Sequence, residues 1–473
     1  MVDLNNLDLT KLSGLNIHFI GIGGAGMSGI ARIMLAKSIE VSGSDKSESQ
    51  MTMALKALGA KVQIGHDAKN IDGADLVVVS AAISKNNPEY AAAVTAGIPI
   101  AARATALSWL LSDSRSVAVA GTHGKTTTTA MLTVALQAAG VDPSFAIGGT
   151  INSAGTNAHS GNGDVFVVEA DESDGSFLAY QPFGAIITNI EMDHVDHFTS
   201  EEHLFQTFAE FVTSIKTGGF LVVCGDDSGV KKLIQMIINS NIKIITYGQG
   251  PDNDYQISRI QLAAESSTAQ ITINGRKAGE LALAVPGLHN LLNSLAAFAA
   301  GCALGANEVK LIQGLSSFSG TKRRFELKGD VNGIKVIDDY GHHPTEIAVT
   351  LTAARKLAGS GRVLTVFQPH RYSRTSAFAK EFAQSLALSD FVYLLEVYAA
   401  SEKPIEGVSA LLISKLMPTN KVQFEPSMLQ VVTDVAGAAK SGDVIIILGA
   451  GDVSSLSAPI LEAISTNQFG ASV

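Results

Sequence analysis

The stretch Val117-Ala-Val-Ala-Gly-Thr-His-Gly-Lys-Thr-Thr127 decides how this 473-residue chain folds. Its apolar start predicts a buried strand, and residues 128–139 after it predict a helix. A glycine-rich turn between a strand and a helix surrounds an anion with backbone N–H groups and the positive end of the helix. Lys125 adds a point charge, and a threonine hydroxyl can bind Mg²⁺. The stretch therefore predicts a phosphate-binding loop for a nucleoside triphosphate, although Val119 stands where the general P-loop pattern has its first glycine.

Composition favours an α/β protein, and a chain of this length is too long to fold around one hydrophobic core, so we expect about two to four domains. Hydrophobic residues make up 46% of the sequence, and its 45 glycines suit many tight turns. The net charge of −10 argues against broad binding to nucleic acid or anionic membranes. Cys224 and Cys302 are too few and too isolated for a disulfide framework or a zinc site. With no secretory signal and no apolar stretch long enough to span a bilayer, we expect a cytoplasmic protein.

Strands and helices alternate along three segments of the chain, which is typical of parallel sheets. We predict strands at 17–20, 40–45 and 76–80; then at 117–120, 165–168, 184–189, 220–223 and 242–247; and then at 333–337, 363–367, 391–395 and 444–448. Alternating residues near 255–285 predict a small antiparallel sheet, and 319–324 a hinge. We therefore expect a Rossmann-like domain over 1–113, a central P-loop ATPase-like α/β domain over 114–325, and a second Rossmann-like domain over 326–473.

A second glycine-rich loop lies between the first predicted strand and helix. Gly21, Gly23 and Gly26 fit Gly-x-Gly-x-x-Gly, and Asp45 ends the next strand. This pattern alone indicates a dinucleotide-dependent dehydrogenase. The same geometry binds any pyrophosphate, including that of a nucleotide sugar, or simply packs a helix closely. Nothing else in the sequence indicates hydride transfer.

Carboxylates follow two strands of the central segment. Glu169-Ala-Asp-Glu-Ser-Asp174 ends one strand, and Asp193 and His194 follow the next. Carboxylates beside a phosphate loop can hold Mg²⁺, and a solvated acidic turn is the alternative. Because Mg²⁺ prefers oxygen, His194 fits a hydrogen-bonding role as well as a ligand role.

Basic and histidine-rich clusters mark the third segment. Arg323 and Arg324 could clamp a γ-phosphate when domains close, or lie in a solvated linker. Asp338-Asp-Tyr-Gly-His-His-Pro344 and Gln368-Pro-His-Arg-Tyr-Ser-Arg374 each follow a predicted strand. Within the second cluster, Arg371 and Arg374 can address one carboxylate together. Two such clusters at adjacent strand ends predict a ligand site.

Taken together, these motifs resemble the Mur ligases, the ATP-dependent amino-acid-adding enzymes of bacterial cell-wall synthesis. The resemblance spans essentially the whole chain, and within the family it points to the branch that adds L-alanine to UDP-N-acetylmuramate. It rests on Phe19-Ile-Gly-Ile-Gly-Gly-Ala-Gly-Met27, Gly121-Thr-His-Gly-Lys-Thr126, Glu169-Ala-Asp-Glu-Ser-Asp174, Asn189-Ile-Glu-Met-Asp-His194, His289-Asn-Leu-Leu-Asn293, Arg323-Arg-Phe-Glu326, Asp338-Asp-Tyr-Gly-His-His-Pro344 and Gln368-Pro-His-Arg-Tyr-Ser-Arg-Thr375.

The resemblance implies domains for UDP-sugar, ATP and amino-acid binding, in that order. It implies that ATP and Mg²⁺ convert the lactyl carboxylate of UDP-N-acetylmuramate to an acyl phosphate, which the amine of L-alanine attacks. The products would be UDP-N-acetylmuramoyl-L-alanine, ADP and phosphate, in the peptidoglycan synthesis that supports cell shape and division. No nucleic acid or membrane partner is expected, and the chain would be a monomer or a weak homodimer.

The resemblance also implies the residues of the site. ATP would contact Gly121, Thr122, His123, Gly124, Lys125, Thr126, Thr127, Asn290, Asn293, Arg324 and Asp339, and the metal would contact Thr126, Glu169 and His194. The catalytic residues would be Lys125, Glu169, His194, His342, Arg371 and Arg374. Alanine and the reacting carboxylate would meet Tyr340, His342, His370, Arg371 and Arg374, and the UDP-sugar would meet Gly23, Gly24, Gly26, Asp45, His66 and Ser80.

Three alternatives stay open. One is a ligase that attaches a recycled tripeptide to the same nucleotide sugar, and another is an NAD(P)-dependent oxidoreductase built on the first glycine-rich loop. The third is a non-catalytic binding protein regulated by a nucleotide, against which Lys125, Glu169 and His194 argue.

Overall fold

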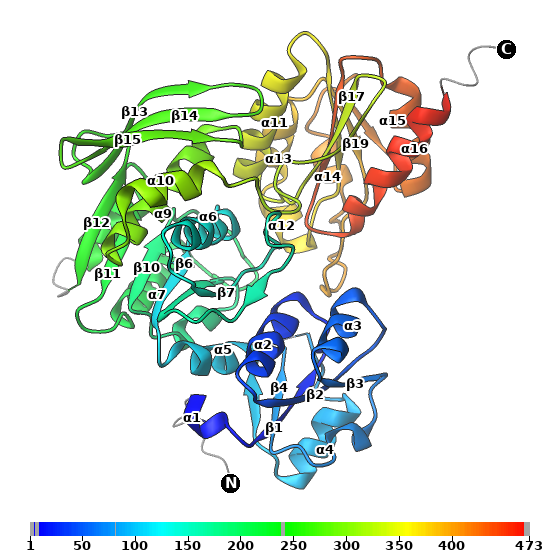
Figure 1. Ribbon diagram of the computed structural model, residues 1–473. Helices are drawn as coiled ribbons and strands as arrows, with labels where there is room; N and C mark the ends of the chain where they lie inside the picture. Colours follow the sequence, from blue (N-terminus) through cyan, green and yellow to red (C-terminus); the bar gives the residue numbers. More distant parts are fainter. Residues whose placement is uncertain (1–3, 5–8, 81, 238–241, 468–473) are drawn as a thin grey trace.

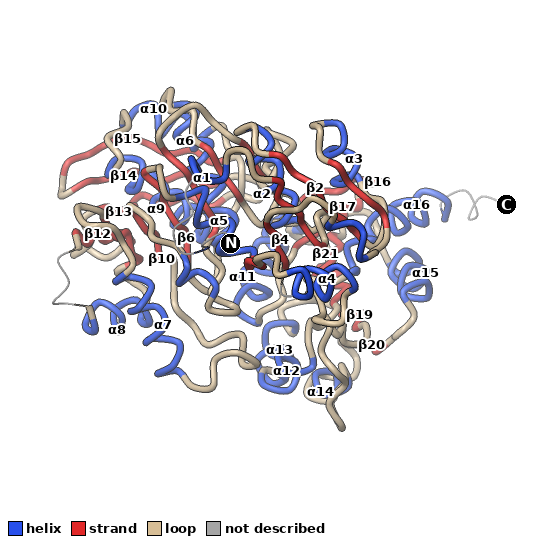
Figure 2. The backbone as a smooth tube through the Cα atoms, turned by 90° about the horizontal axis from the view of Figure 1, so that it is seen from below, coloured by secondary structure: helices blue, strands red, loops and turns tan. Residues whose placement is uncertain are grey.

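The computed structural model describes residues 4, 9–80, 82–237 and 242–467. Three sheets follow one another along the chain, and in Figure 1 the N-terminal sheet lies below the other two. Seen from below in Figure 2, α7 (Glu201–Thr213) and α8 (Ser228–Met236) lie at one edge of the molecule, and α15 (Met428–Ala438) and α16 (Ser457–Asn467) at the other. None of the described helices has the length and hydropathy needed to cross a membrane.

The N-terminal sheet is parallel throughout, in the order β3-β2-β1-β4-β5. Its central strand β1 (Asn16–Ile20) is flanked by strands reached through crossovers on opposite sides, so the loop after β1 lies at a topological switch point. The remaining elements are α1 (Leu9–Leu12), α2 (Ala25–Ala36), β2 (Glu40–Asp45), α3 (Gln50–Ala57), β3 (Lys61–Ile64), η2 (Ala68–Ile71), β4 (Leu76–Val79), α4 (Pro88–Ala96), β5 (Ile100–Ala102) and α5 (Arg103–Leu111).

The central sheet has ten strands in the order β15-β14-β13-β12-β11-β10-β6-β9-β7-β8. Its strands are β6 (Arg115–Ala120), β7 (Ser144–Ala146), β8 (Ala158–His159), β9 (Val165–Glu169), β10 (Gly184–Ile187), β11 (Phe220–Cys224), β12 (Lys243–Gly248), β13 (Tyr255–Leu262), β14 (Ser267–Ile273) and β15 (Arg276–Leu283). Beside α7 and α8, its helices are α6 (Lys125–Ala138), η3 (Ser176–Ala179), α9 (Leu288–Ala303) and α10 (Glu308–Ser316).

The antiparallel strands predicted near 255–285 are present, but they extend the large central sheet and do not form a sheet of their own. The strands β13, β14 and β15 are antiparallel, but β12 pairs with β13 and joins them to the large sheet. The Asp254 carboxylate fixes this join, because it accepts hydrogen bonds from the backbone N–H of Thr246 at 2.8 Å and from its hydroxyl at 3.0 Å. A local side-chain contact of this kind leaves no mark in the alternation of apolar residues.

The helix after the phosphate loop begins at Lys125, three residues before its predicted start at Thr128. Threonines are weak helix formers, which is why the run after the lysine did not indicate a helix. Their hydroxyls bond within the helix, from Thr129 to the carbonyl of Lys125 at 2.8 Å and from Thr133 to that of Thr129 at 2.9 Å. The lysine therefore stands in the first turn of α6, which packs against α9 and α10.

The C-terminal sheet has the order β16-β17-β21-β18-β19-β20. The hairpin of β16 (Glu326–Val331) with β17 (Ile334–Asp339) is antiparallel, and the other pairs are parallel. The further strands are β18 (Val363–Phe367), β19 (Phe391–Leu394), β20 (Val422–Phe424) and β21 (Val444–Leu448). The helices are α11 (Pro344–Ala358), α12 (Tyr372–Ala377), α13 (Ala379–Leu386), α14 (Leu411–Ser414) and η4 (Asp452–Leu456), beside α15 and α16.

The segment between the central and C-terminal sheets has unusual backbone angles. Gly320 has φ of 94°, and the non-glycine residues Arg323 and Phe325 have φ of 58° and 49°. Hydrogen bonds hold them there: Glu326 accepts from the N–H of Arg323 at 2.8 Å, and Asp339 from the N–H of Phe325 at 2.8 Å. The segment predicted as a hinge is therefore a strained and tightly bonded connection.

Candidate active site

The glycines of the phosphate loop occupy positions that no other residue fits. Gly121 has φ of 122°, and a Cβ there would lie 2.2 Å from the hydroxyl of Thr188. Gly124 has φ of 84°, and its Cβ would lie 2.7 Å from the side-chain oxygen of Asn293. Val119, at the position of the missing glycine, is a fully buried residue of β6. The loop therefore turns two residues later than the general P-loop pattern requires.

Lys125 reaches from the first turn of α6 into a group of acceptors. Its ammonium donates to the carbonyl of Gly121 at 2.8 Å, to that of Thr122 at 3.3 Å, and to the carboxylate of Glu172 at 2.9 Å. Burial by itself lowers the pKa of Lys125, but the charges of Glu172 and Asp171 outweigh it and raise the pKa above its usual value. The lysine is therefore a fixed positive charge beside the loop.

Glu169 lies beside the hydroxyl of Thr126, as a shared metal site requires. Its carboxylate accepts from that hydroxyl at 3.1 Å and from the N–H of Gly148 at 2.8 Å. Octahedral Mg²⁺ with bonds of about 2.05 Å separates neighbouring ligand oxygens by about 2.9 Å. The pair therefore fits two adjacent positions around Mg²⁺.

His194 lies in a second group. Its ring nitrogen and the carboxylates of Asp171 and Glu172 all lie within 4.8 Å of one another. Burial lowers the pKa of His194, so the imidazole is neutral, and its Nδ1 has no hydrogen-bond partner. Glu169, predicted to share a metal with His194, bonds to Thr126 and Gly148, and the shared metal stays a prediction.

A cavity of about 290 Å³ joins the predicted nucleotide residues from separate segments. Asp339 lines it, although its carboxylate also accepts from Phe325, Gly341 and Thr350. His289, beside these residues, has its pKa lowered to about 4 by burial and by the charge of Arg324. The predicted residues on its wall are His123, Gly124, Thr127, Asn290, Asn293, Arg324 and Asp339.

The two arginines of the predicted alanine pocket pair with carboxylates of the central domain. Arg374 is 3% exposed and donates from Nε and Nη2 to the two oxygens of Asp193, at 2.8 and 3.1 Å. Arg371, which is more exposed, pairs with Asp196. These contacts bring the C-terminal domain against the strand end that carries His194.

The histidines of that pocket are neutral. Burial lowers the pKa of His342 to about 3 and that of His370 to about 4. Their rings lie 5.9 Å apart, and the ring of Tyr340 lies 5.3 Å from that of His342. Tyr340, His342, His370, Arg371 and Arg374 thus lie in one region, but the strands that precede them, β17 and β18, are not adjacent as predicted, because β21 lies between them.

The predicted UDP-sugar residues gather at the switch point of the N-terminal sheet. Asp45 accepts from the N–H of Gly23 at 2.9 Å, so part of its role is to fix the glycine loop. His66, after β3, lies 3.0 Å from the hydroxyl of Ser44 and 3.5 Å from the buried carboxylate of Glu89. Ser80 follows β4 and is half-buried.

The sequence prediction missed Arg103 at this site. The half-buried guanidinium crowds the glycine loop, because a Cβ on Gly26 would lie 2.7 Å from its Nη1. Arg103 forms no hydrogen bond or ion pair with any residue that the structure describes. Its position directly after the short strand β5 was the available signal, but three residues are too few to predict a strand.

The fold and the site define a nucleotide-binding enzyme of three α/β units with catalytic groups at the junction of the last two. Family models match along the chain: "Mur ligase family, catalytic domain" over 16–115, "Mur ligase middle domain" over 119–301, and "Mur ligase, glutamate ligase domain" over 323–451. The chain belongs to the Mur ligase family. The predicted domain boundaries at 113/114 and 325/326 stay predictions.

Individual relatives are similar over nearly the full length. The UDP-N-acetylmuramate–L-alanine ligase of Renibacterium salmoninarum is 47% identical over 465 residues, which cover 98% of each chain. The crystal structure of UDP-N-acetylmuramate-alanine ligase MurC from Thermotoga maritima matches with a TM-score of 0.80 at 30% identity, over 96% of this chain and 100% of that one. A murein peptide ligase Mpl from Psychrobacter arcticus matches with a TM-score of 0.71 at 27% identity, over 96% and 99%.

Proposed function

We propose that this chain is an ATP-dependent ligase that joins L-alanine to the lactyl carboxylate of UDP-N-acetylmuramate in peptidoglycan synthesis. The products are UDP-N-acetylmuramoyl-L-alanine, ADP and phosphate. The observation that supports this chemistry is the contact between arginines near the C-terminal sheet and the central domain. Arg324 lies 3.5 Å from the hydroxyl of Thr126 in the phosphate loop, and Arg374 binds Asp193. The 47% identity to the ligase of that name supports the choice of substrates.

The first step activates a carboxylate, which is a poor electrophile while ionised. Transfer of the γ-phosphoryl group of ATP forms a bond from a carboxylate oxygen to phosphorus and breaks the bond to the β-phosphate oxygen, so ADP leaves. Such a transfer depends on positioning and on neutralising crowded negative charge. Lys125 and Arg324 supply positive charge from opposite sides of the loop. We propose that Thr126 and Glu169 hold Mg²⁺, which neutralises phosphate charge when bound, and that His194 completes this site.

In the second step the neutral amine of L-alanine attacks the acyl carbon, and the tetrahedral intermediate expels phosphate, which takes up the proton that the nitrogen loses. His342, with a pKa of about 3, is too weak a base to carry the amine's proton at neutral pH. We assign it the role of accepting a hydrogen bond that orients the amine. Of the two arginines, Arg371 is the better partner for the alanine carboxylate, because its pair with Asp196 is accessible, with 29% of the Arg371 side chain exposed, whereas the pair of Arg374 with Asp193 is buried. Tyr340 and His370 complete the pocket wall.

We assign the UDP-sugar to the switch point of the N-terminal sheet. Gly23, Gly24 and Gly26 allow close approach of the pyrophosphate, and the unpaired Arg103 is positioned to bind it bidentately. Asp45, His66 and Ser80 form the rim of the same site. We further propose a cytoplasmic location and a monomer or weak homodimer, which size-exclusion chromatography with light scattering tests directly.

The deciding experiment measures ADP release with UDP-N-acetylmuramate and each amine acceptor in turn. We expect turnover with L-alanine, and none with the tripeptide L-alanyl-γ-D-glutamyl-meso-diaminopimelate. Turnover with the tripeptide alone would contradict the assignment and indicate a murein peptide ligase. Binding of NADH without binding of the UDP-sugar would also contradict it and would indicate an oxidoreductase.

A further inference from the structure

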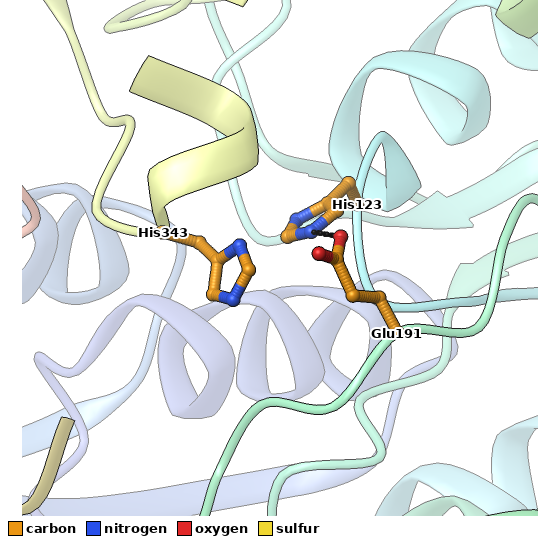
Figure 3. A group of neighbouring side chains, drawn as sticks. All are labelled: His123, Glu191 and His343. Atoms are coloured by element: carbon orange, nitrogen blue, oxygen red, sulfur yellow. Dashed lines mark hydrogen bonds and ion pairs between the residues drawn. The ribbon is translucent and has the colours of Figure 1, made fainter. Parts of the chain in front are cut away.

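Two imidazoles and a carboxylate converge at the contact between the central and C-terminal domains. Figure 3 shows His123, Glu191 and His343, which come from three separate segments of the chain. One ligand atom of each lies within 4.8 Å of the others. None of the three belongs to the sites assigned above to Mg²⁺, and of the three only His123 has a predicted role, as a contact of ATP.

The fold fixes the position of each member. His123 lies in the phosphate loop, and its Nε2 is 3.1 Å from Oε2 of Glu191, in the loop after β10. His343 is the N-cap residue of α11, and its ring centroid lies 4.8 Å from that of His123. Two ligand atoms therefore come from the central domain and one from the C-terminal domain.

The surroundings match those of protein metal sites. Ligating histidines generally donate their second ring nitrogen to a carboxylate, and ligating carboxylates are themselves hydrogen-bonded. Nδ1 of His123 lies 3.3 Å from Oε1 of Glu346. The hydroxyl of Thr345 donates to both oxygens of Glu191, at 2.8 and 2.9 Å. Burial by itself lowers the pKa of His123, but its hydrogen bonds to Glu191 and Glu346 outweigh this and raise the pKa to about 9, so an ion at Nε2 has to displace the proton shared with Glu191.

His343 supplies an independent indication. The residue is 2% exposed, and its Nε2 is buried without a hydrogen-bond partner. Its other nitrogen, Nδ1, accepts only a long bond of 3.4 Å from the N–H of Thr345. In Figure 3 this Nδ1, and not Nε2, lies on the side of His123 and Glu191, so a weakly bonded ring nitrogen faces the group.

We propose that His123, Glu191 and His343 form a site for a divalent transition ion of the Zn²⁺ class, which ties the phosphate loop to the C-terminal domain. Two imidazoles and one carboxylate suit Zn²⁺ and not Mg²⁺, which prefers oxygen. Bonds of about 2.0–2.2 Å place tetrahedral ligands about 3.4 Å apart, so ligand atoms within 4.8 Å need only small side-chain shifts. Because His123 and Glu191 line the nucleotide cavity, the fourth position opens toward it.

The test titrates Zn²⁺ and, separately, Co²⁺ into the full chain without nucleotide. Equilibrium dialysis counts bound ions, and the visible spectrum of Co²⁺ reports four-coordination. We expect one ion whose affinity falls at least about tenfold in His343→Asn and in Glu191→Gln, because each removes a ligand. His194→Asn, in the neighbouring histidine–carboxylate group, and His203→Asn, an exposed histidine elsewhere, should retain it.

Solution scattering supplies a second measurement. Because the site takes ligands from two domains, Zn²⁺ should narrow the distribution of interatomic distances in wild type and not in Glu191→Gln. Unchanged ion stoichiometry and affinity in both His343→Asn and Glu191→Gln would overturn the proposal, as would loss of the ion only in His194→Asn. Should His343→Asn fail to fold, Glu191→Gln decides alone, since glutamine still accepts the hydrogen bond of Thr345.

Discussion

The chain carries two glycine-rich turns between a strand and a helix, and their surroundings differ in charge. The loop at 21–26 has an acid, Asp45, bound to its own backbone, and its arginine, Arg103, comes from a different helix. The loop at 121–127 has Lys125 within the following helix, surrounded by carboxylates. The first loop suits a pyrophosphate that only binds, and the second suits a phosphate chain that reacts. The glycine pattern of each loop predicts an anion site, and the charged residues around the loop determine whether the bound phosphate groups react.

The largest effect should come from the lysine of the second loop. Lys125→Ala should lower kcat for ADP release by at least about 100-fold, because it removes the fixed charge at the transferred group. Binding of UDP-N-acetylmuramate by calorimetry should stay within about twofold of wild type. Since Glu172 loses its partner, Lys125→Ala combined with Glu172→Gln is the matched control for folding. Normal turnover in Lys125→Ala would remove the distinction between the two loops.

Replacing one glycine of each loop by alanine tests whether the two loops differ in backbone strain. Gly124→Ala places a Cβ at φ of 84° and 2.7 Å from Asn293, and should lower both kcat and the free energy of unfolding, the latter by about 2 kcal/mol. Gly24 has φ of −61°, and its Cβ would meet nothing nearer than 3.4 Å. Gly24→Ala should therefore cost under about 1 kcal/mol in urea unfolding. Equal losses in the two variants would contradict the difference in backbone strain.

The arginine of the first loop should affect one substrate only. Arg103→Ala should raise KM for UDP-N-acetylmuramate about tenfold, the loss expected for a charge-assisted hydrogen bond, with KM for ATP unchanged. Lys37→Ala, an exposed cation at the end of α2, is the control and should leave both values unchanged. If Arg103→Ala raised both KM values equally, the substitution would be acting through the fold and not through binding of the pyrophosphate.

The smallest effect on turnover should come from Glu89, beneath the first loop. Burial alone raises the pKa of this carboxyl, but the nearby His18 ring, whose Nε2 lies 3.6 Å from Oε2, and the hydrogen bonds from Ser44 and Asn70 outweigh it and lower the pKa to about 2. A pKa lowered on folding stabilises the protein above pH 4.5 and ceases to do so as the pH falls toward 2. Glu89→Gln should therefore lose up to about 3 kcal/mol of unfolding free energy at pH 7 and progressively less below pH 4.5.

The fluorescence of Trp109, the only tryptophan in the sequence, follows this unfolding, because it lies in α5 beside the same sheet. His159→Gln, an exposed histidine of the central domain, serves as a control. A pH-independent difference between wild type and Glu89→Gln would mean that the carboxyl is not charged in the fold.

Most of the fold could be predicted from the sequence, and the elements that could not be predicted are short or exposed. Long apolar strands such as β6 and β21 were found, because buried parallel strands carry continuous apolar runs. The short strands β3, β5 and β20, and the strand β16, whose residues are mostly exposed, lack such runs. Within the candidate site, motifs predicted several residues that the structure brings together, including Thr126 and Glu169. They did not predict that Arg374 is bound to Asp193 or that Arg103 reaches Gly26, because these contacts join segments far apart in the chain.

The strained connection before β16 has a consequence for motion. The ten hydrogen-bonded strands make the central sheet about 43 Å wide, and a sheet of this width resists bending in its own plane. Rotation of the C-terminal domain against it must therefore be absorbed by a few backbone angles, and among them are the left-handed ones of Arg323 and Phe325. A change of either angle to the ordinary region would turn the C-terminal domain against the central sheet, so relief of backbone strain and domain rotation would be coupled at this connection.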